Sequence, residues 1–361
     1  MNRRKWQSRP GSVSSVSNNV VSAARRRSHL GGSWVALSIL ITWTAAWVTP
    51  DLQSDLFTED FSQNPSQRNT WWVAGDASHF HWNAEHQRLD VTWDSTRPNA
   101  FYLHPLPTIL TRAESFHFRF RLQLSDLQTT PGESTFQIAV GLVRQADSQS
   151  PGFFRGAGIH PIWGPRNLIE FDYFPPSEAV TATFSAVAVA TNNARWAMVN
   201  RFPFELEPSV PHQIEIRHAA TESQLELRVL RDGLPLTGGT THLDARFGDF
   251  RVDAFAVISY NGAHQPAGYG GQILAHGSID DIEIEYPPGP KVVLQPSSPA
   301  EPATFAIESV PGWFPVLERR VEGGPWLALP ANPISTDHGW RLTDTEPPPL
   351  SALYRARLER P

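Results

Sequence analysis

Apolar and polar residues alternate through most of the chain between residues 57 and 286. The clearest case is the segment 116–124, in which every even position is apolar and every odd position is polar. A two-residue period is typical of a strand with one face buried and the other in water. The same period recurs at 89–93, 136–142, 202–206, 214–216 and 225–229.

Two further segments, 184–190 and 255–258, are continuously apolar and predict strands that are buried on both faces. Turn sequences such as Pro131-Gly132 and Asp232-Gly233 separate the predicted strands, and the chain has 32 prolines and 24 glycines. Ten or more short strands within about 230 residues favour two packed antiparallel sheets. We therefore predict an all-β jelly-roll sandwich over residues 51–286.

Proline-dense sequence follows the predicted sandwich and indicates a domain boundary. Residues 287–303 have no hydrophobic periodicity, which is typical of an extended, semi-rigid linker. Residues 304–361 again show short apolar runs and predict a small β module. Thr343-Asp344-Thr345 followed by Tyr354 resembles the end of a fibronectin type III-like sandwich, in which a tyrosine packs at a corner between sheets.

The first 50 residues have the features of an export signal. They contain seven basic residues and no acidic one, and the stretch from Leu30 to Pro50 is uncharged. Its apolar part, Trp34 to Val48, is shorter than the ~20 residues that span a bilayer, which favours a signal peptide. An uncleaved N-terminal anchor is the alternative, in which residues 30–50 make the membrane contact. Either leader predicts a periplasmic, cell-surface or extracellular protein.

Composition excludes several classes of site and partner. Without the leader, 23 basic and 36 acidic residues leave a net charge of about −13, so nucleic acid is not an expected partner. The chain has no cysteine, which excludes disulfides, thiolate metal sites and a cysteine nucleophile.

Four short segments, in chain order, resemble the concanavalin A-like superfamily of lectins, laminin G-like modules and laminarinase-type glycoside hydrolases. The resemblance covers about 230 of the 361 residues and rests mainly on the order of the segments. It implies the same jelly roll and a polysaccharide or cell-surface glycan as the partner. The segments are 56–61 with Trp71 and Trp72 downstream, 88–92, 169–174 and 277–284.

The segment 169–174 resembles the central strand that carries the catalytic carboxylates in those hydrolases. A retaining mechanism needs two carboxyl groups ~5 Å apart on one strand face, and the resemblance places them at the first and fifth positions. Here Glu170 and Asp172 occupy the first and third positions, but the fifth is Phe174. We therefore expect no catalytic residue and a non-catalytic module, with a laminarinase-like hydrolase or lyase using Glu170 and Asp172 as the alternative.

Glu170 and Asp172 are also candidate ligand-binding residues. The competing interpretation is that they pair with arginines such as Arg166 or Arg195 inside the concave face. Aromatic rings near this strand can stack on sugar rings. The aromatic candidates are Trp163, which Gly164-Pro165 places in a loop, together with Tyr173 and Trp196.

Acidic residues near the first and last strands of the sandwich predict a structural calcium ion. The resemblance to carbohydrate-binding jelly rolls implies that such carboxylates converge at the sandwich edge, and Ca²⁺ accepts oxygen ligands in loose geometry. The alternation around Ile279 and Ile282 also predicts a β-bulge at Asp280-Asp281, which would turn one carboxylate sideways. The alternative is that these residues cap a turn. The predicted ligands are Glu59, Asp60, Asp280 and Asp281.

His79 and His81 share one strand face and could hold a metal ion, but no third ligand has suitable spacing, so a solvated pair is favoured.

Taken together, the sequence predicts an exported, non-catalytic glycan-binding or cell-envelope interaction protein. The alternatives are the glycan-cleaving enzyme and a purely structural surface protein.

Overall fold

The computed structural model describes most of the chain after the leader. The described residues are 54–288, except 69, 131–134, 161–162, 179, 202 and 267–269, and then 292–295, 303–308, 314–321, 326–329, 333–336, 339–346 and 352–359. The predicted leader, residues 1–50, lies outside them. Within the described part of the chain, no helix is long and apolar enough to cross a membrane.

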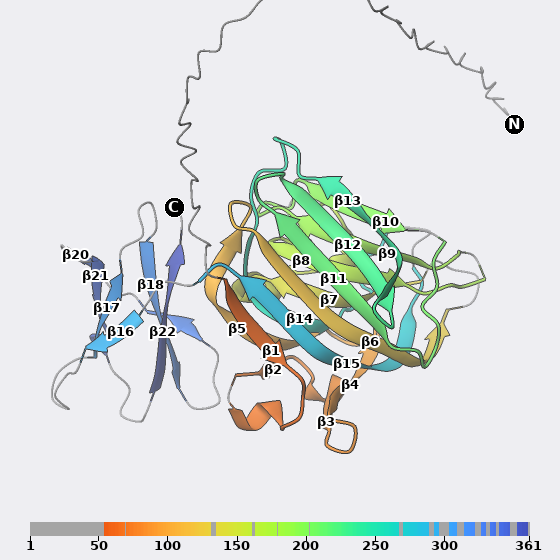
Figure 1. Ribbon diagram of the computed structural model, residues 1–361, viewed down its shortest axis with the longest axis horizontal. Coiled ribbons are helices and arrows are strands. Elements are labelled where there is room, and N and C mark those ends of the chain that lie inside the picture. The colour runs from red at the N-terminus through yellow and green to blue at the C-terminus, as the bar shows by residue number, and fades with distance from the viewer. Residues whose placement is uncertain are drawn as a thin grey trace, which may run out of the picture. The chain divides into compact units, whose positions relative to one another are not determined.

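Two large antiparallel sheets form the main domain (Figure 1). The first sheet has eight strands in the order β13-β12-β11-β6-β15-β4-β3, with β1 paired to β15. Its strands are β1 (Asp55–Glu59), β3 (Phe80–Asn83), β4 (Arg88–Asp94), β6 (Phe116–Thr129), β11 (His212–Ala219), β12 (Gln224–Arg231), β13 (Leu234–His242) and β15 (Ile273–Tyr286).

The second sheet has seven strands in the order β10-β9-β8-β7-β14-β5-β2. Consecutive strands are paired at one end of each sheet, as in β11-β12-β13 and β7-β8-β9-β10, whereas pairs such as β6 with β15 and β5 with β14 join strands distant in sequence, as the crossing connections of a jelly roll require. The strands of the second sheet are β2 (Trp72–Ala74), β5 (Ala100–Thr111), β7 (Ile138–Val143), β8 (Leu168–Phe174), β9 (Thr183–Val189), β10 (Trp196–Arg201) and β14 (Arg251–Ser259).

The core lies between the two sheets and follows the alternation in the sequence. In β6 the even residues Phe116 to Leu124 are buried, while the odd residues are partly buried or exposed. Phe120 packs edge-on against Phe171 of β8 and Phe255 of β14, with ring centroids 6.0 and 6.4 Å apart. The two-sheet sandwich confirms the predicted all-β jelly roll.

Strands β9 and β14 are buried along almost their whole length, as their continuous apolar sequences predicted. On the outer face of the second sheet, Arg155 from the connection between β7 and β8 contacts Glu170 and Asp172 of β8. Helical structure in the described residues is limited to single turns. These are the 3₁₀ turns Pro65–Arg68, Ala77–His79 and Arg155–Ala157 and the α-turn α1 (Gln145–Ser148).

The C-terminal module has two small antiparallel sheets that share a core of Phe305, Ile307, Leu317, Leu342 and Ala356. Val292–Gln295 lies within the predicted linker but forms β16, so the module begins before residue 304. The strands of one sheet are β16 (Val292–Gln295), β17 (Thr304–Glu308), β20 (Ile334–Thr336) and β21 (Gly339–Thr343), and those of the other are β18 (Phe314–Val321), β19 (Leu327–Ala328) and β22 (Ala352–Glu359).

Tyr354 of β22 donates a hydrogen bond from its hydroxyl to Asp344 Oδ2 at 2.7 Å, and Arg319 contacts the same oxygen at 2.8 Å. These contacts tie the end of β21 to β18 and β22. The likeness of this module to fibronectin type III domains stays a prediction.

Candidate functional site

Strand β8 lies at the centre of the second sheet and carries the two predicted carboxylates. Phe171 faces the first sheet, so its neighbours Glu170 and Asp172 point to the outer face. Gly141 of β7 is paired with Glu170, and a Cβ on Gly141 would lie 2.4 Å from the Glu170 Cα. Only glycine therefore fits beside Glu170 without moving the backbone.

Both carboxylates are paired with one arginine. Arg155 Nε donates to Glu170 Oε1 at 2.5 Å, and an Nη of Arg155 donates to Asp172 Oδ2 at 2.7 Å. The side chain of Arg155 is 5% exposed and both acids are fully buried. The interpretation that Glu170 and Asp172 pair with an arginine is therefore confirmed. The arginine is Arg155, however, and not Arg166 or Arg195. The connection between β7 and β8 brings Arg155 over the strand, a placement that sequence spacing does not reveal.

The two other carboxylate oxygens are also occupied. Tyr260 donates its hydroxyl to Glu170 Oε2 at 2.8 Å, and Gln137 donates its amide to Asp172 Oδ1 at 3.1 Å. We call Arg155, Glu170, Asp172, Tyr260 and Gln137 the buried ion cluster. Each of its four carboxylate oxygens accepts a hydrogen bond, as buried polar atoms must to offset their lost hydration.

Burial sets the protonation of this cluster. It raises the pKa of Asp172 well above its usual value, and the adjacent Glu170 carboxylate adds to the effect while Arg155 opposes it. Burial likewise raises the pKa of the Tyr260 hydroxyl, again reinforced by Glu170. No carboxylate of the cluster reaches the solvent, so none is presented to a substrate on the outer face.

Two of the predicted aromatic residues pack against other side chains of the domain. Tyr173 is only 1% exposed, lies on the core side of β8, and accepts a hydrogen bond from the backbone N–H of Leu206 at 3.2 Å. Trp196 is partly buried, and its ring lies 4.4 Å from Cζ of Arg155 in a cation–π contact. Tyr173 therefore belongs to the core, which corrects its prediction as a ligand-binding residue, whereas the ligand-binding role of Trp196 stays a prediction.

Trp163 is the predicted aromatic residue that reaches the surface, with 44% of it exposed. Its indole is stacked on the His160 ring at 5.2 Å between centroids and 11° between planes. The Trp163 backbone N–H also donates to His160 Nδ1 at 3.0 Å. Both contacts fix the orientation of the exposed indole.

A groove of about 820 Å³ lies at the β2–β5 edge of the second sheet, and sequence reasoning did not identify it. Its walls are aromatic rings with neutral amide and hydroxyl groups, and none of the described residues lining it is charged. The aromatic residues are the partly buried Trp72 and Phe154 and the 2% exposed Phe101 and Phe153, the polar ones are Asn99, Ser148, Gln149, Ser150 and Asn261, and the others are Val73, Ala74, Gly75, Pro98 and Pro151.

Side-chain hydrogen bonds hold the groove walls in place. Asn99 donates its amide to the Phe153 carbonyl at 2.8 Å, and its Oδ1 accepts from the backbone N–H of Asn261 at 2.7 Å. Gly75 has φ of +92°, and a Cβ there would lie 2.5 Å from the Asn99 carbonyl oxygen. The sequence signals for this groove were Trp71-Trp72 and the turns at Asn99 and Asn261. These segments are far apart in the chain, and only the tertiary structure brings them together.

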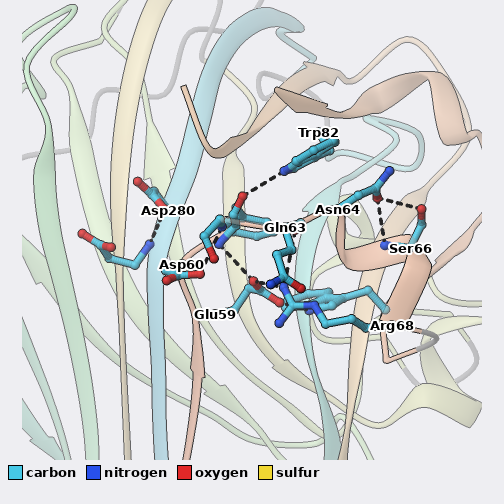
Figure 2. A network of polar contacts seen from close by, with 12 residues as sticks. Glu59, Asp60, Gln63, Asn64, Ser66, Arg68, Trp82 and Asp280 are labelled. Carbon is cyan, nitrogen blue, oxygen red and sulfur yellow. Dashed lines mark hydrogen bonds and ion pairs between the residues drawn. The ribbon is translucent and has the colours of Figure 1, made fainter. Parts of the chain in front are cut away.

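Calcium binding by the four predicted carboxylates stays a prediction, and Figure 2 shows three of them, Glu59, Asp60 and Asp280, with their polar contacts. Glu59 is 2% exposed. It accepts hydrogen bonds from Arg68 at 2.6 Å, from the Phe61 backbone N–H at 2.9 Å and from Trp71 Nε1 at 2.9 Å. These donors already occupy its carboxylate, which therefore serves as an internal acceptor.

The predicted bulge at Asp280-Asp281 is confirmed. The β15–β6 register shifts between Asp280 and Glu283, and Asp281 has φ of +46°. Asp281 is turned toward Arg121, with which it forms an ion pair at 2.5 Å. Within the described part of the chain, no group of three or more acidic or histidine side chains is placed to hold a metal ion.

Burial raises the pKa of Asp280 to about 6, and the nearby Asp281 and Asp60 add to this while Arg121 opposes it. Because the pKa of Asp280 is higher in the folded state than its usual value of 3.8, the protonated carboxyl favours the folded state. This stabilisation is complete below pH 3.8 and is lost as the pH rises through about 6. We therefore expect Asp280→Asn to raise the melting temperature relative to wild type at pH 7 but not at pH 4. The exposed control Glu222→Gln should follow the wild type at both pH values, and an equal Asp280→Asn effect at both would contradict the assignment.

No protein-family model matches the sequence, and no curated protein matches it. Solved structures do match the fold. Peanut lectin in complex with a peptide is 12% identical, with 65% of this chain and 98% of that chain covered and a TM-score of 0.42. Lectin II from Ulex europaeus is 14% identical, with 65% and 99% covered and a TM-score of 0.43. A mutant alginate lyase in complex with alginate tetrasaccharide is 7% identical, with 63% and 96% covered and a TM-score of 0.37. At these identities the likeness concerns the fold alone.

The histidine pair has a structural role on the other sheet. His79 is 2% exposed, and its Nδ1 is 2.7 Å from the Thr92 carbonyl oxygen, whereas His81 of β3 is exposed. The carbonyl contact requires a proton on Nδ1 of His79. The metal site considered for this pair is not formed by the described residues.

Proposed function

We propose that this protein binds uncharged glycans without cleaving them, and that the groove at the β2–β5 edge is the binding site. The observation that carries the proposal is the lining of the groove, which combines aromatic rings with neutral amides and hydroxyls. Aromatic faces pack against the C–H faces of sugar rings, while amides and hydroxyls exchange hydrogen bonds with sugar hydroxyls. A lining without charge favours an uncharged glycan over an acidic one, because nothing there would neutralise a buried carboxylate.

The state of the carboxylates on β8 supports a non-catalytic role. Glycoside hydrolysis of the laminarinase type needs two carboxyl groups exposed to the scissile bond. Glu170 and Asp172 are fully buried and bonded to Arg155. The only predicted catalytic carboxylates are therefore closed to a substrate, while the groove at the sheet edge remains open.

We also propose that the protein acts outside the cytoplasm, in the periplasm, at the cell surface or in the extracellular space. The basic leader followed by the uncharged stretch from residue 30 to 50 supports this proposal. A glycan in the cell envelope or at a cell surface would be accessible from that location.

Binding to neutral oligosaccharides tests the proposed function. We expect the full-length protein to bind at least one linear gluco-, xylo- or manno-oligosaccharide in calorimetric titration, without release of new reducing ends. Phe154→Ala should weaken binding about tenfold, which corresponds to ~1.4 kcal/mol, because it removes a ring from the groove wall. Gln149→Ala should weaken it less, since Gln149 is exposed and supplies one amide.

The matched control is Phe314→Ala, which removes a 48% exposed ring from the C-terminal module and should leave affinity unchanged. Glycan cleavage that Glu170→Gln abolishes would replace this proposal with the hydrolase or lyase. Tighter binding of uronate oligosaccharides than of neutral ones would contradict the uncharged ligand. Failure of every oligosaccharide to bind would leave a purely structural surface protein.

A further inference from the structure

Four aromatic rings continue the groove across the neighbouring loops. Phe154 lines the groove and lies 4.2 Å from the His264 ring, measured between centroids. His264 lies 5.1 Å from Trp163, and Trp163 is stacked on His160 at 5.2 Å. We call Phe154, His264, Trp163 and His160 the aromatic platform. It forms one contiguous surface with the groove because Phe154 belongs to both.

The aromatic platform is accessible. His264 is exposed, and Trp163 is 44% exposed even though His160 covers one face of its indole. The Trp163 indole thus keeps this exposure although both His160 and His264 contact it. Contiguous exposed apolar surface bordered by polar groups marks binding sites more often than a single exposed ring does, and Trp163 belongs to such a row of adjacent rings.

Asn193 contacts the described residues on both sides of Trp163. The Asn193 amide donates to the carbonyl oxygens of Gly158 and His160 at 3.1 and 3.2 Å, and its Oδ1 accepts from Trp196 Nε1 at 2.7 Å. The loop approaches so closely that a Cβ on Gly164, where φ is +134°, would lie 2.3 Å from the Asn193 amide nitrogen.

This support continues into the interior of the domain. Trp196 lies against Arg155, so the buried ion cluster holds the same loop from the inside. A platform that is ordered before the ligand arrives loses less entropy on binding than a mobile one.

We infer that the site binds a chain of several sugar rings, with one end in the groove and the other on the aromatic platform. This inference rests on the proposed function and adds that the ligand is an extended, uncharged oligosaccharide or polysaccharide. The sugar units in the groove and on the aromatic platform belong to one chain. Once the first unit is bound, the contact of the second is intramolecular and increases the affinity. A longer chain can fill the groove and still contact Trp163, because the His264 ring bridges Phe154 and Trp163.

The test is a length series in full-length wild type and Trp163→Ala, using linear neutral oligosaccharides from disaccharide to hexasaccharide. In the wild type we expect affinity to rise about tenfold with length. In Trp163→Ala the disaccharide should bind within about twofold of the wild type, and the gain with length should be lost. Trp163→Phe retains a flat ring and should keep most of the gain, which separates stacking from a general disturbance of the loop.

Phe314→Ala is the matched control and should reproduce the wild-type length series. An unchanged melting temperature in Trp163→Ala would show that the fold is intact. Equal affinity for short and long chains in the wild type, or a full length gain in Trp163→Ala, would overturn the extended site and leave groove binding in place. If no length binds to either protein, the proposed function fails and this inference fails with it.

Discussion

Arg155→Met is expected to destabilise the main domain by about 3–5 kcal/mol. The substitution leaves Glu170 and Asp172 side by side at full burial without their cation, and breaking a buried ion pair from one side has costs of this size. Methionine matches the length of the arginine stem, so the lost packing is small by comparison. The measurement is the urea midpoint of unfolding at constant m-value.

Two companion variants separate charge from packing. Arg246→Met removes an arginine of similar size from a pair in which Arg246 is 75% and Asp244 54% exposed, and it should change stability by less than about 0.5 kcal/mol. Adding Glu170→Gln and Asp172→Asn to Arg155→Met should recover part of the loss, because no buried charge then lacks a partner. An Arg155→Met midpoint equal to that of the wild type would show that the buried ion cluster is not formed.

Glu59→Ala is expected to cost about 2–4 kcal/mol, although Glu59 lies in a short strand near the start of the domain. Its carboxylate accepts two buried hydrogen bonds, one from the Trp71 indole N–H and one from the Phe61 backbone N–H. Each buried donor that loses its acceptor costs ~1–3 kcal/mol. Glu59→Gln keeps one acceptor oxygen and should lose roughly half as much, as measured by urea unfolding.

The adjacent Asp60→Ala serves as the control and should stay within about 0.5 kcal/mol of the wild type, since Asp60 is exposed. The same variants test the calcium hypothesis. We expect the wild-type melting temperature to be the same with millimolar Ca²⁺ and with chelator, because Glu59 is already occupied by donors. A calcium-dependent rise that Glu59→Ala removes would make Glu59 a calcium ligand and contradict its role as an internal acceptor.

The fold was predictable because the sequence patterns that specify its strands each lie within a few adjacent residues. Strict alternation in β6, continuous apolar runs in β9 and β14, and the parity change at Asp280-Asp281 each depend on a few adjacent residues. The two-residue period of a strand converts such patterns directly into buried and exposed faces.

The candidate site was less predictable because it depends on contacts between distant segments. Asp172 and Glu170 were identified from their strand, but their partner Arg155 comes from a loop whose path no periodicity specifies. Tyr173 was assigned to a ligand because it is close in sequence, although strand alternation places it on the opposite face from Glu170. The groove joins Trp72 to Phe154, which are far apart in sequence. Trp163 was found because Gly164-Pro165 is itself a local loop signal.

Strand β1 pairs with the end of β15, so residues 55–59 find their partners at residues 282–286. The first sheet therefore cannot be completed during synthesis until nearly the whole domain has left the ribosome. Pairings this distant in sequence also slow folding, because a long loop must close before its contacts form. The two ends of the domain therefore close the first sheet together, and the last strand completes it.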